Sequence, residues 1–278
     1  MPDRPDLSPA RSLALLYSST AQRPALTALT ALEQEIGASL RPDLDHHVAH
    51  TRLAWWREEC ARTVQGRATH PLTRELTTLF AQVGTEPLAG LAGLVDTAVW
   101  DLACATFDTR RELMAYCERW SGGVIAPLVW LAAPGTAATQ ATALGARLRE
   151  IELLLGLAAD ARSGRLRLPL DELESARLAP DSLVRLPWPP ALAALLRHRH
   201  VELRAALGAA RDALPPEIQP ALRGLIVWAT LACAASARAQ ARLPRNGGPR
   251  NHHAPLDGWR AWRAARRADG ASQRTLRG

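Results

Sequence analysis

Apolar residues recur at helical spacing along much of this chain. Within residues 45–64 they fall every three or four positions, and they do so again within residues 136–160. Residues with this spacing share one face of a helix, which predicts that both stripes face a protein core. The first stripe comprises Ala49, Leu53, Trp56, Cys60 and Val64, and the second comprises Leu144, Leu148, Ile151, Leu155 and Ala158.

Proline and glycine divide the helical pattern into separate segments. We expect residues 161–187 to be mostly non-helical, with one short helical turn near 171–177. The sequence shows no internal repeat. The predicted helices cover residues 9–20, 25–40, 45–64, 71–83, 86–107, 109–133, 136–160, 188–213, 216–242 and 256–268.

Composition favours the same fold class. Leu, Ala and Arg dominate, and hydrophobic residues make up 47% of the 278 residues. Such residues favour helices, so we predict an all-α protein. We expect one helical domain over residues 1–243 and a basic tail over residues 244–278, partly disordered, with one short helix near 256–267. The most apolar run, residues 225–237, is short for a bilayer span and is predicted to be a buried helix.

The chain is strongly basic, with a net charge of +7, and every basic residue is arginine. An excess of arginine is typical of proteins with an anionic partner such as a diphosphate, a lipid headgroup or a nucleic acid. It also results from a GC-rich genome, which encodes arginine in place of lysine. No dense basic run is interleaved with aromatic residues, so we do not expect nucleic acid as the partner.

The cysteines indicate neither a zinc site nor a disulfide framework. Cys60, Cys104, Cys117 and Cys233 lie far apart and form no C-x-x-C pair. We therefore expect reduced thiols in a cytosolic protein. The N-terminal residues include acids and lack the apolar core of a secretory signal, which also favours a cytoplasmic location, either free or peripheral to a membrane.

Four regions occur in an order that resembles the squalene/phytoene synthase family of head-to-head prenyltransferases. The first reads LAWWREE at residues 53–59 with GRATHP at 66–71, the second reads RELMAYCERWSG at 111–122, and the third reads DARSGRLRLP at 160–169. The fourth comprises DALP at 212–215 and WRAWR at 259–263. The resemblance implies the isoprenoid-synthase fold, an all-α helical bundle around a central cavity.

The same resemblance implies that this chain has lost most metal-binding carboxylates of the family. There, two aspartate-rich motifs hold Mg²⁺ ions that neutralise the departing diphosphate, and carboxylates at i, i+3 and i+4 put their oxygens on one helix face. The first motif falls on residues 33–38, EQEIGA, whose best register retains Glu35. The second motif retains Asp160. At its other positions the chain has Arg149, Glu152, Gly156 and Ala159.

We therefore expect a catalytically degenerate family member, a pseudoenzyme with no cofactor, that binds an isoprenoid, another lipid or a protein partner. The alternative is an active Mg²⁺-dependent transferase that joins prenyl diphosphates. In that case Glu35 and Asp160 hold the metal. Arg149, Arg162 and Arg165 then bind the diphosphate.

Each of these candidates also has a structural interpretation. Arg149 lies three positions before Glu152, so the two side chains can form an ion pair on one helix face, which we favour. Arg162 and Arg165 either bind phosphate or shape the loop around them. Asp160 either holds metal or braces that loop, and we favour the brace.

Aromatic residues supply further candidates. Trp56 and Tyr116 are predicted to line a cavity, although Trp56 also belongs to a core stripe. Trp259 and Trp262 lie among arginines in an amphipathic segment that either contacts a membrane surface or packs onto the bundle, and we favour packing.

Several common enzyme classes lack support in this sequence. It contains no P-loop, dinucleotide-binding glycine motif, G-x-S-x-G or H-E-x-x-H. His46 and His50 share a helical face, but only Asp43 and Asp45 lie nearby, so we do not expect a metal site there.

Overall fold

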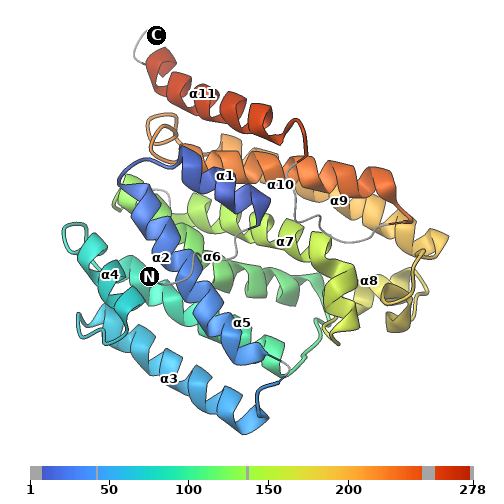
Figure 1. Cartoon of the computed structure of the whole chain (residues 1–278). Helices are drawn as coiled ribbons and strands as arrows, with labels where there is room; N and C mark the ends of the chain where they lie inside the picture. The colour runs from blue at the N-terminus through green and yellow to red at the C-terminus, as the bar shows by residue number, and fades with distance from the viewer. Residues whose placement is uncertain (1–7, 42, 136–137, 246–253, 276–278) are drawn as a thin grey trace.

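The computed structural model describes residues 8–41, 43–135, 138–245 and 254–275, with side chains for all of these except 138 and 271–275. The described residues form α-helices joined by turns and short 3₁₀ segments, and they contain no strand (Figure 1). The all-α prediction is confirmed. In chain order the elements are α1 (Pro9–Tyr17), α2 (Gln22–Gly37), η1 (Ala38–Leu40), α3 (His46–Val64), α4 (Pro71–Phe80), η2 (Glu86–Leu91), α5 (Ala92–Leu102), α6 (Arg110–Ala132), α7 (Ala138–Arg162), α8 (Leu170–Ser175), η3 (Pro180–Leu183), α9 (Pro190–Asp212), α10 (Arg223–Arg242) and α11 (Asp257–Thr275).

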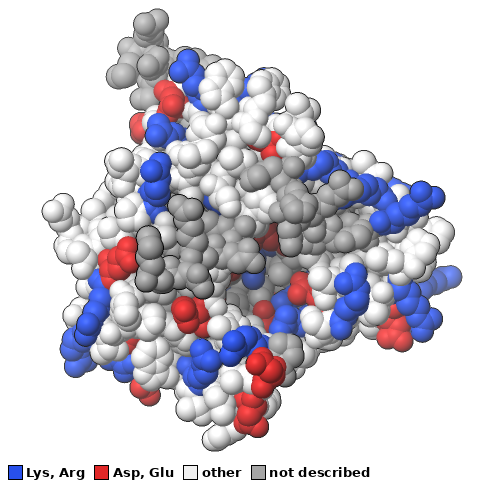
Figure 2. Space-filling model, in the orientation of Figure 1, with Lys and Arg blue, Asp and Glu red and all other residues white. Residues whose placement is uncertain are grey.

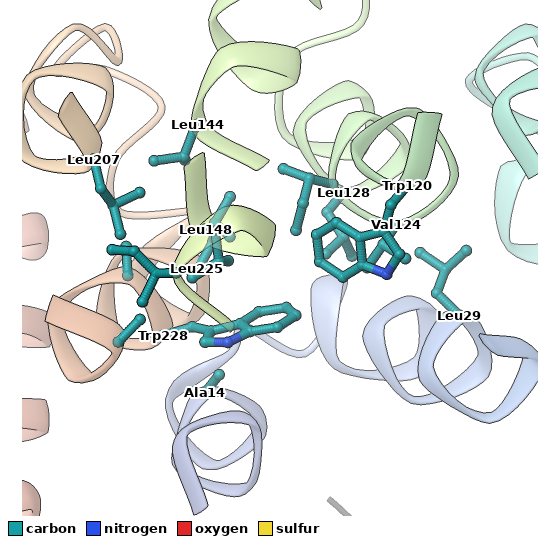
Figure 3. Close-up of a cluster of buried hydrophobic side chains, with 14 of the residues drawn as sticks. Ala14, Leu29, Trp120, Val124, Leu128, Leu144, Leu148, Leu207, Leu225 and Trp228 are labelled. Atoms are coloured by element: carbon teal, nitrogen blue, oxygen red, sulfur yellow. The ribbon is translucent and has the colours of Figure 1, made fainter. Parts of the chain in front are cut away.

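Helices α6 and α7 pack along each other and organise the bundle. Helices α2 and α5 pack against α6, and α9 and α10 pack against α7. A Cβ atom at Gly145 of α7 would lie 2.0 Å from Oγ of Ser121, so glycine permits the close approach of α6 and α7. Buried side chains fill the space between α6, α7 and α10 (Figure 3), among them Trp120, Val124, Leu128, Leu144, Leu148, Leu225 and Trp228.

The two predicted core stripes face inward at most of their positions. On α3, Val64 is partly exposed at the end of the helix, and on α7, Leu155 is partly exposed. The other eight stripe residues are buried, as predicted: Ala49, Leu53, Trp56, Cys60, Leu144, Leu148, Ile151 and Ala158.

Among the helix boundaries that differ from the prediction, two have identifiable reasons. The predicted helix 86–107 divides into η2 and α5 and ends at Leu102, because Cys104 adopts a left-handed φ of 48°. The predicted helix 216–242 begins at Arg223. Pro216 and Pro220 lack the N–H group that helical hydrogen bonding requires, so the chain forms turns there instead.

The C-terminal segment packs onto the bundle. Helix α11 runs along α10 and also contacts α1, and its contact face consists largely of alanines, so the predicted packing is confirmed. The helix extends beyond the predicted end to Thr275. The predicted disorder of the tail falls on residues 246–253 and 276–278, which lie outside the described residues. Among the described helices, none combines the length and the apolar character needed to cross a bilayer.

Candidate functional site

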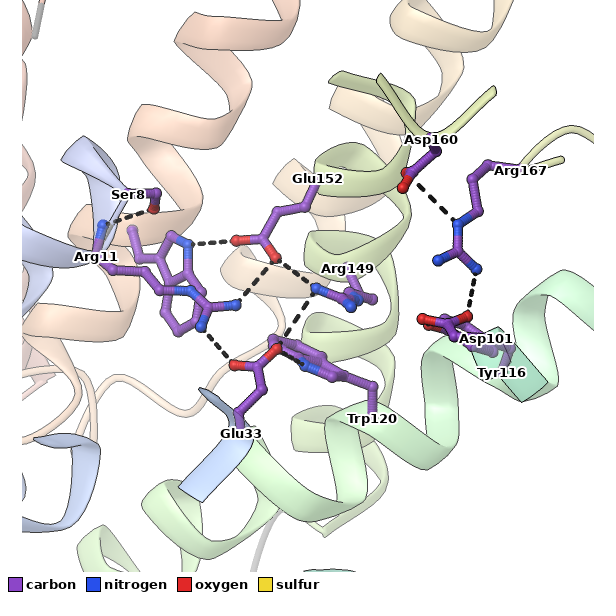
Figure 4. Close-up of polar contacts among 11 residues, drawn as sticks. Ser8, Arg11, Glu33, Asp101, Tyr116, Trp120, Arg149, Glu152, Asp160 and Arg167 are labelled. Carbon is purple, nitrogen blue, oxygen red and sulfur yellow. Dashed lines mark hydrogen bonds and ion pairs between the residues drawn. The ribbon is translucent and has the colours of Figure 1, made fainter. Parts of the chain in front are cut away.

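Two carboxylates and two guanidinium groups from three helices meet beside the core tryptophans (Figure 4). Arg11 belongs to α1, Glu33 to α2, and Arg149 and Glu152 to α7. The closest nitrogen–oxygen distances from Arg11 are 2.5 Å to Glu33 and 3.2 Å to Glu152. Those from Arg149 are 3.6 Å and 3.4 Å to the same two carboxylates. We call these four residues the ion-pair quartet, and their formal charges cancel.

Two tryptophans hold the carboxylates of the quartet. Nε1 of Trp120 donates a hydrogen bond of 2.7 Å to Glu33, and Nε1 of Trp228 donates one of 3.1 Å to Glu152. The guanidinium of Arg11 lies 4.6 Å from the ring centre of Trp228, within cation–π range. Every charged side chain of the quartet is at most 20% exposed. The site is therefore largely dry, and each charge in it has a partner.

Glu33 and Arg149 of the quartet are held in their charged forms. Burial raises the pKa of Glu33, but the charges of Arg11 and Arg149 and hydrogen bonds from Arg11 and Trp120 outweigh it and lower the pKa to about 2. Burial works to lower the pKa of Arg149, whereas Tyr116, Glu33 and Glu152 raise it above the ordinary arginine value. Neither residue exchanges a proton near neutral pH, so both are unsuited to general acid–base chemistry.

A second charged network lies at the end of α7. Oδ2 of Asp160 lies 3.5 Å from Nε of Arg167, and Nη1 of the same arginine lies 2.7 Å from Asp101 of α5. The hydroxyl of Tyr116 donates to the Asp101 carboxylate at 3.1 Å. Burial raises the pKa of Asp160, and the charges of Arg167 and Arg165 oppose that effect only in part. Asp160 is thus paired with an arginine of the following loop.

The two residues predicted as metal ligands have different surroundings. Glu35 is exposed on α2, whereas Glu33, two positions earlier, points into the quartet. Asp160 is paired with Arg167.

The three predicted diphosphate-binding arginines also have different surroundings. Arg149 makes the predicted ion pair with Glu152. Arg162 is exposed. Arg165 is half-buried, and its Nε has no hydrogen-bond partner in the described part of the chain.

Trp56 and Tyr116 lie in different parts of the core. Trp56 packs edge-on against Trp55 and His70, where α3 meets α4. Tyr116 packs edge-on against Phe107 and reaches the Asp101 network. Neither of them lines the groove described next.

An elongated groove of about 760 Å³ includes two members of the quartet in its wall. Arg11, Glu152 and Trp228 form one end, and the ion pair of Arg238 with Asp257, 2.8 Å long, lies at the other end. The rest of the lining is mainly apolar and includes Pro9 and Ala10 of α1, Leu155 of α7, and Leu231, Ala232, Ala235 and Ala241 of α10. The groove therefore suits a long apolar molecule with a small polar end.

Sequence and structure comparisons agree on the relatives of this fold. A family profile described as squalene/phytoene synthase matches residues 6–260. The chain belongs to this family. A dehydrosqualene synthase crystallised with a ligand superposes with a TM-score of 0.75 at 16% identity, over 95% of this chain and 92% of that one. Squalene synthase HpnC from Alicyclobacillus acidocaldarius superposes with a TM-score of 0.68 at 20% identity, over 83% and 88% of the two chains. No curated protein gives a significant match. The predicted family and isoprenoid-synthase fold are confirmed.

The donor set of this squalene/phytoene synthase relative does not fit the Mg²⁺ ions that the family resemblance implies. Magnesium requires several carboxylate or water oxygens around one point. Here guanidinium groups hold Glu33 and Glu152, Glu35 is exposed, and Asp160 is paired with Arg167. Across the described ranges, no group of three or more His, Cys, Asp or Glu side chains could hold a metal ion.

The WWREE and THP segments, which carry part of the resemblance to the family, have a structural role here. Glu59 is fully buried, and its carboxylate accepts hydrogen bonds from the backbone N–H groups of Thr69 at 2.7 Å and His70 at 2.8 Å. The hydroxyl groups of Thr69 and Thr73 also donate to it. Burial raises the pKa of Glu59, but these hydrogen bonds lower it to about 2. The ionised carboxylate therefore fixes the turn between α3 and α4.

Arg11 and Arg167 are among the network residues that the sequence-based predictions do not include. The available signal for Arg11 is its place three residues before the buried Ala14, on the inward face of a mostly apolar helix. Arg167 offers no comparable signal, because the run RLRLP presents two arginines with similar neighbours.

Proposed function

We propose that this protein is a catalytically degenerate squalene/phytoene synthase relative that binds an isoprenoid or another lipid without a metal. The observation that carries the proposal is the ion-pair quartet. Arg11 and Arg149 lie between acidic side chains of α2 and α7, the helices to which the family resemblance assigns the aspartate motifs. A cytoplasmic location and a protein partner stay predictions from the sequence.

The electrostatics of the quartet support this proposal. Each of its carboxylates already interacts with two guanidinium groups and one indole N–H. A metal ion bound to those carboxylate oxygens would leave two largely buried arginines without their partners. Breaking a buried ion pair in this way costs about 3–5 kcal/mol. The quartet therefore competes with metal binding and leaves no carboxylate free for it.

The groove supports a lipid as the ligand. Its volume of about 760 Å³ falls within the size range of ordinary small-molecule sites. Its apolar lining suits a hydrocarbon chain. Its charged groups can form hydrogen bonds with a hydroxyl group, because a carboxylate accepts from it and a guanidinium donates to it. A prenyl alcohol such as farnesol has this character and needs no metal.

Calorimetric titration with farnesol in EDTA tests the proposal. Ala235 lines the groove on α10, and Ala237 of the same helix is exposed, so Ala235→Trp and Ala237→Trp form a matched pair. We expect the wild-type protein and Ala237→Trp to bind, and Ala235→Trp to bind about tenfold more weakly or worse, because its indole fills the groove. Circular dichroism checks that both variants are folded. Absence of binding by the wild type, or equal binding by a folded Ala235→Trp, would overturn the proposal.

A further inference from the structure

The outer face of α11 exposes large apolar side chains that the bundle does not use. Trp259 is 52% exposed, Trp262 is 51% exposed, and Leu256, just before the helix, is 56% exposed. The inner face packs on α10 through small residues, namely Ala261, Ala264, Ala265 and Ala268. Packing onto the bundle therefore explains the alanines and leaves the two tryptophans without a role. Clustered exposed aromatic residues are typical of an interaction surface.

The acidic residues of α11 are engaged with the bundle. Asp257 pairs with Arg238 at 2.8 Å, and Asp269 pairs with Arg223 at 3.4 Å, and both of these arginines belong to α10. The outer surface of α11 is therefore left without an unpaired acid among its described side chains.

Arginines accompany the tryptophans on the outside. The guanidinium of Arg263 lies 4.4 Å from the ring centre of Trp259, and Arg266 and Arg267 are exposed. In Figure 2, the upper part of the molecule, where α11 lies, carries arginine atoms together with some acidic atoms and uncharged surface. Positive charge and aromatic surface thus occur together on one face.

A basic groove of about 540 Å³ lies beside this face, between α11, α10 and the end of α9. Four arginines line it, namely Arg211, Arg260, Arg263 and Arg267. Asp212 is the one acid among its described lining residues, and it pairs with Arg211 at 2.8 Å. Trp259 forms part of the same wall. Arginine side chains bind phosphate oxygens with paired hydrogen bonds, so the groove suits phosphate groups.

We propose that α11 docks this protein on an anionic lipid bilayer. Trp259, Trp262 and Leu256 enter the headgroup region, where tryptophan has its preferred place, and the neighbouring arginines contact lipid phosphates. Helix α11 then lies in the plane of the surface. The proposal goes beyond lipid binding in the apolar groove and does not depend on it, although Asp257 at the start of α11 lines the end of that groove.

A bilayer fits this surface better than a nucleic acid does. Tryptophan and arginine can bind either ligand, because nucleic-acid bases stack on aromatic rings and the phosphates of both ligands bind arginine. The exposed Leu256 distinguishes them, because an aliphatic side chain gains from entering lipid and contributes little to base stacking. The surface therefore suits an anionic membrane. Binding to nucleic acid is the competing result that the test must distinguish.

Vesicle flotation tests the docking helix. The full-length protein is mixed with vesicles of phosphatidylcholine alone or of equal parts phosphatidylcholine and phosphatidylglycerol. We expect binding to the mixed vesicles that weakens as salt is added. The double variant Trp259→Ala, Trp262→Ala should bind about tenfold more weakly, since it loses the side chains that enter the bilayer. The matched control is Trp55→Ala on α3, which removes another exposed tryptophan (41%) and should bind as the wild type does.

Charge reversal gives an independent measurement. Arg266→Glu combined with Arg267→Glu should abolish binding to the mixed vesicles, whereas Arg185→Glu, an exposed arginine outside α11, should leave it intact. Failure of the wild type to float, or equal flotation of the tryptophan variant, would contradict the proposal. Binding to single-stranded DNA without vesicle binding would also overturn it. Flotation of Ala235→Trp at the wild-type level, with loss of farnesol binding, separates this proposal from the groove proposal.

Discussion

Arg149 of α7 lies 3.6 Å from Glu33 of α2, across the space between the two helices that carry the aspartate motifs in the family resemblance. Carboxylates facing each other across such a space repel unless cations lie between them. In this protein the cations belong to the chain itself, because Arg11 and Arg149 both lie within ion-pair distance of Glu33 and Glu152. The site therefore holds together without a metal or a diphosphate.

Removing a guanidinium from the quartet should destabilise the fold. We expect Arg149→Ala to lower the free energy of unfolding by about 2–4 kcal/mol, because two largely buried carboxylates lose a partner. The control is Arg57→Ala, which breaks an ion pair of 2.6 Å with Asp96 whose side chains are 55% and 38% exposed. That loss should be no more than about 1 kcal/mol. Urea unfolding measures both, and equal losses would contradict the structural role of the quartet.

Acid should weaken the fold through Glu33. Its folded pKa, about 2, lies below its unfolded value, so its contribution is complete above the unfolded pKa and is lost as the pH falls toward 2. Between pH 7 and pH 3 this group alone should cost about 2 kcal/mol of unfolding free energy. Glu33→Gln should be less stable at pH 7 but should lose less on acidification. Urea unfolding at both pH values measures the difference, and parallel losses in the two proteins would refute the assignment.

Asp101 should matter more for stability than Asp160. Asp101→Ala leaves the buried Arg167 with a single acid at 3.5 Å, and we expect a loss of about 2–4 kcal/mol. Asp160→Ala leaves the 2.7 Å pair of Arg167 with Asp101 intact, so the loss should be about 1 kcal/mol. Thermal unfolding with and without Mg²⁺ compares the two variants. Stabilisation of the wild type by Mg²⁺ that disappears in Asp160→Ala would instead identify Asp160 as a metal ligand.

The close approach of α6 and α7 can be tested at one glycine. A methyl group at Gly145 would meet Ser121 and Ile125, so Gly145→Ala should cost about 1–3 kcal/mol through overpacking. Gly208, near the C-terminal end of α9, has open space where a Cβ atom would lie, and Gly208→Ala should stabilise the protein by about 0.5–1 kcal/mol. Denaturant unfolding of the pair checks the sign of each change.

Local sequence patterns predict the helices of this protein better than its charged networks. Core stripes on α3 and α7 follow helical spacing, and the ion pair of Arg149 with Glu152 follows from their separation of three positions. Glu33 is different. Within α2 alone, Glu35 fits the register of the family motif better than Glu33 does. Glu33 is nevertheless the residue whose side chain points into the quartet. Its partners Arg11 and Trp120 come from other helices, and local spacing carries no information about such contacts.

Titration with farnesyl diphosphate tests the central claim most directly. Calorimetry in Mg²⁺ and then in EDTA, with an assay for released pyrophosphate, separates metal-dependent chemistry from simple binding. With Arg11 and Arg149 occupying the carboxylates, Mg²⁺ should make no difference to binding, and no pyrophosphate should appear. Tight Mg²⁺-dependent binding with release of pyrophosphate would contradict the degenerate site and would support an active prenyl transferase with Glu35 and Asp160 as its metal ligands.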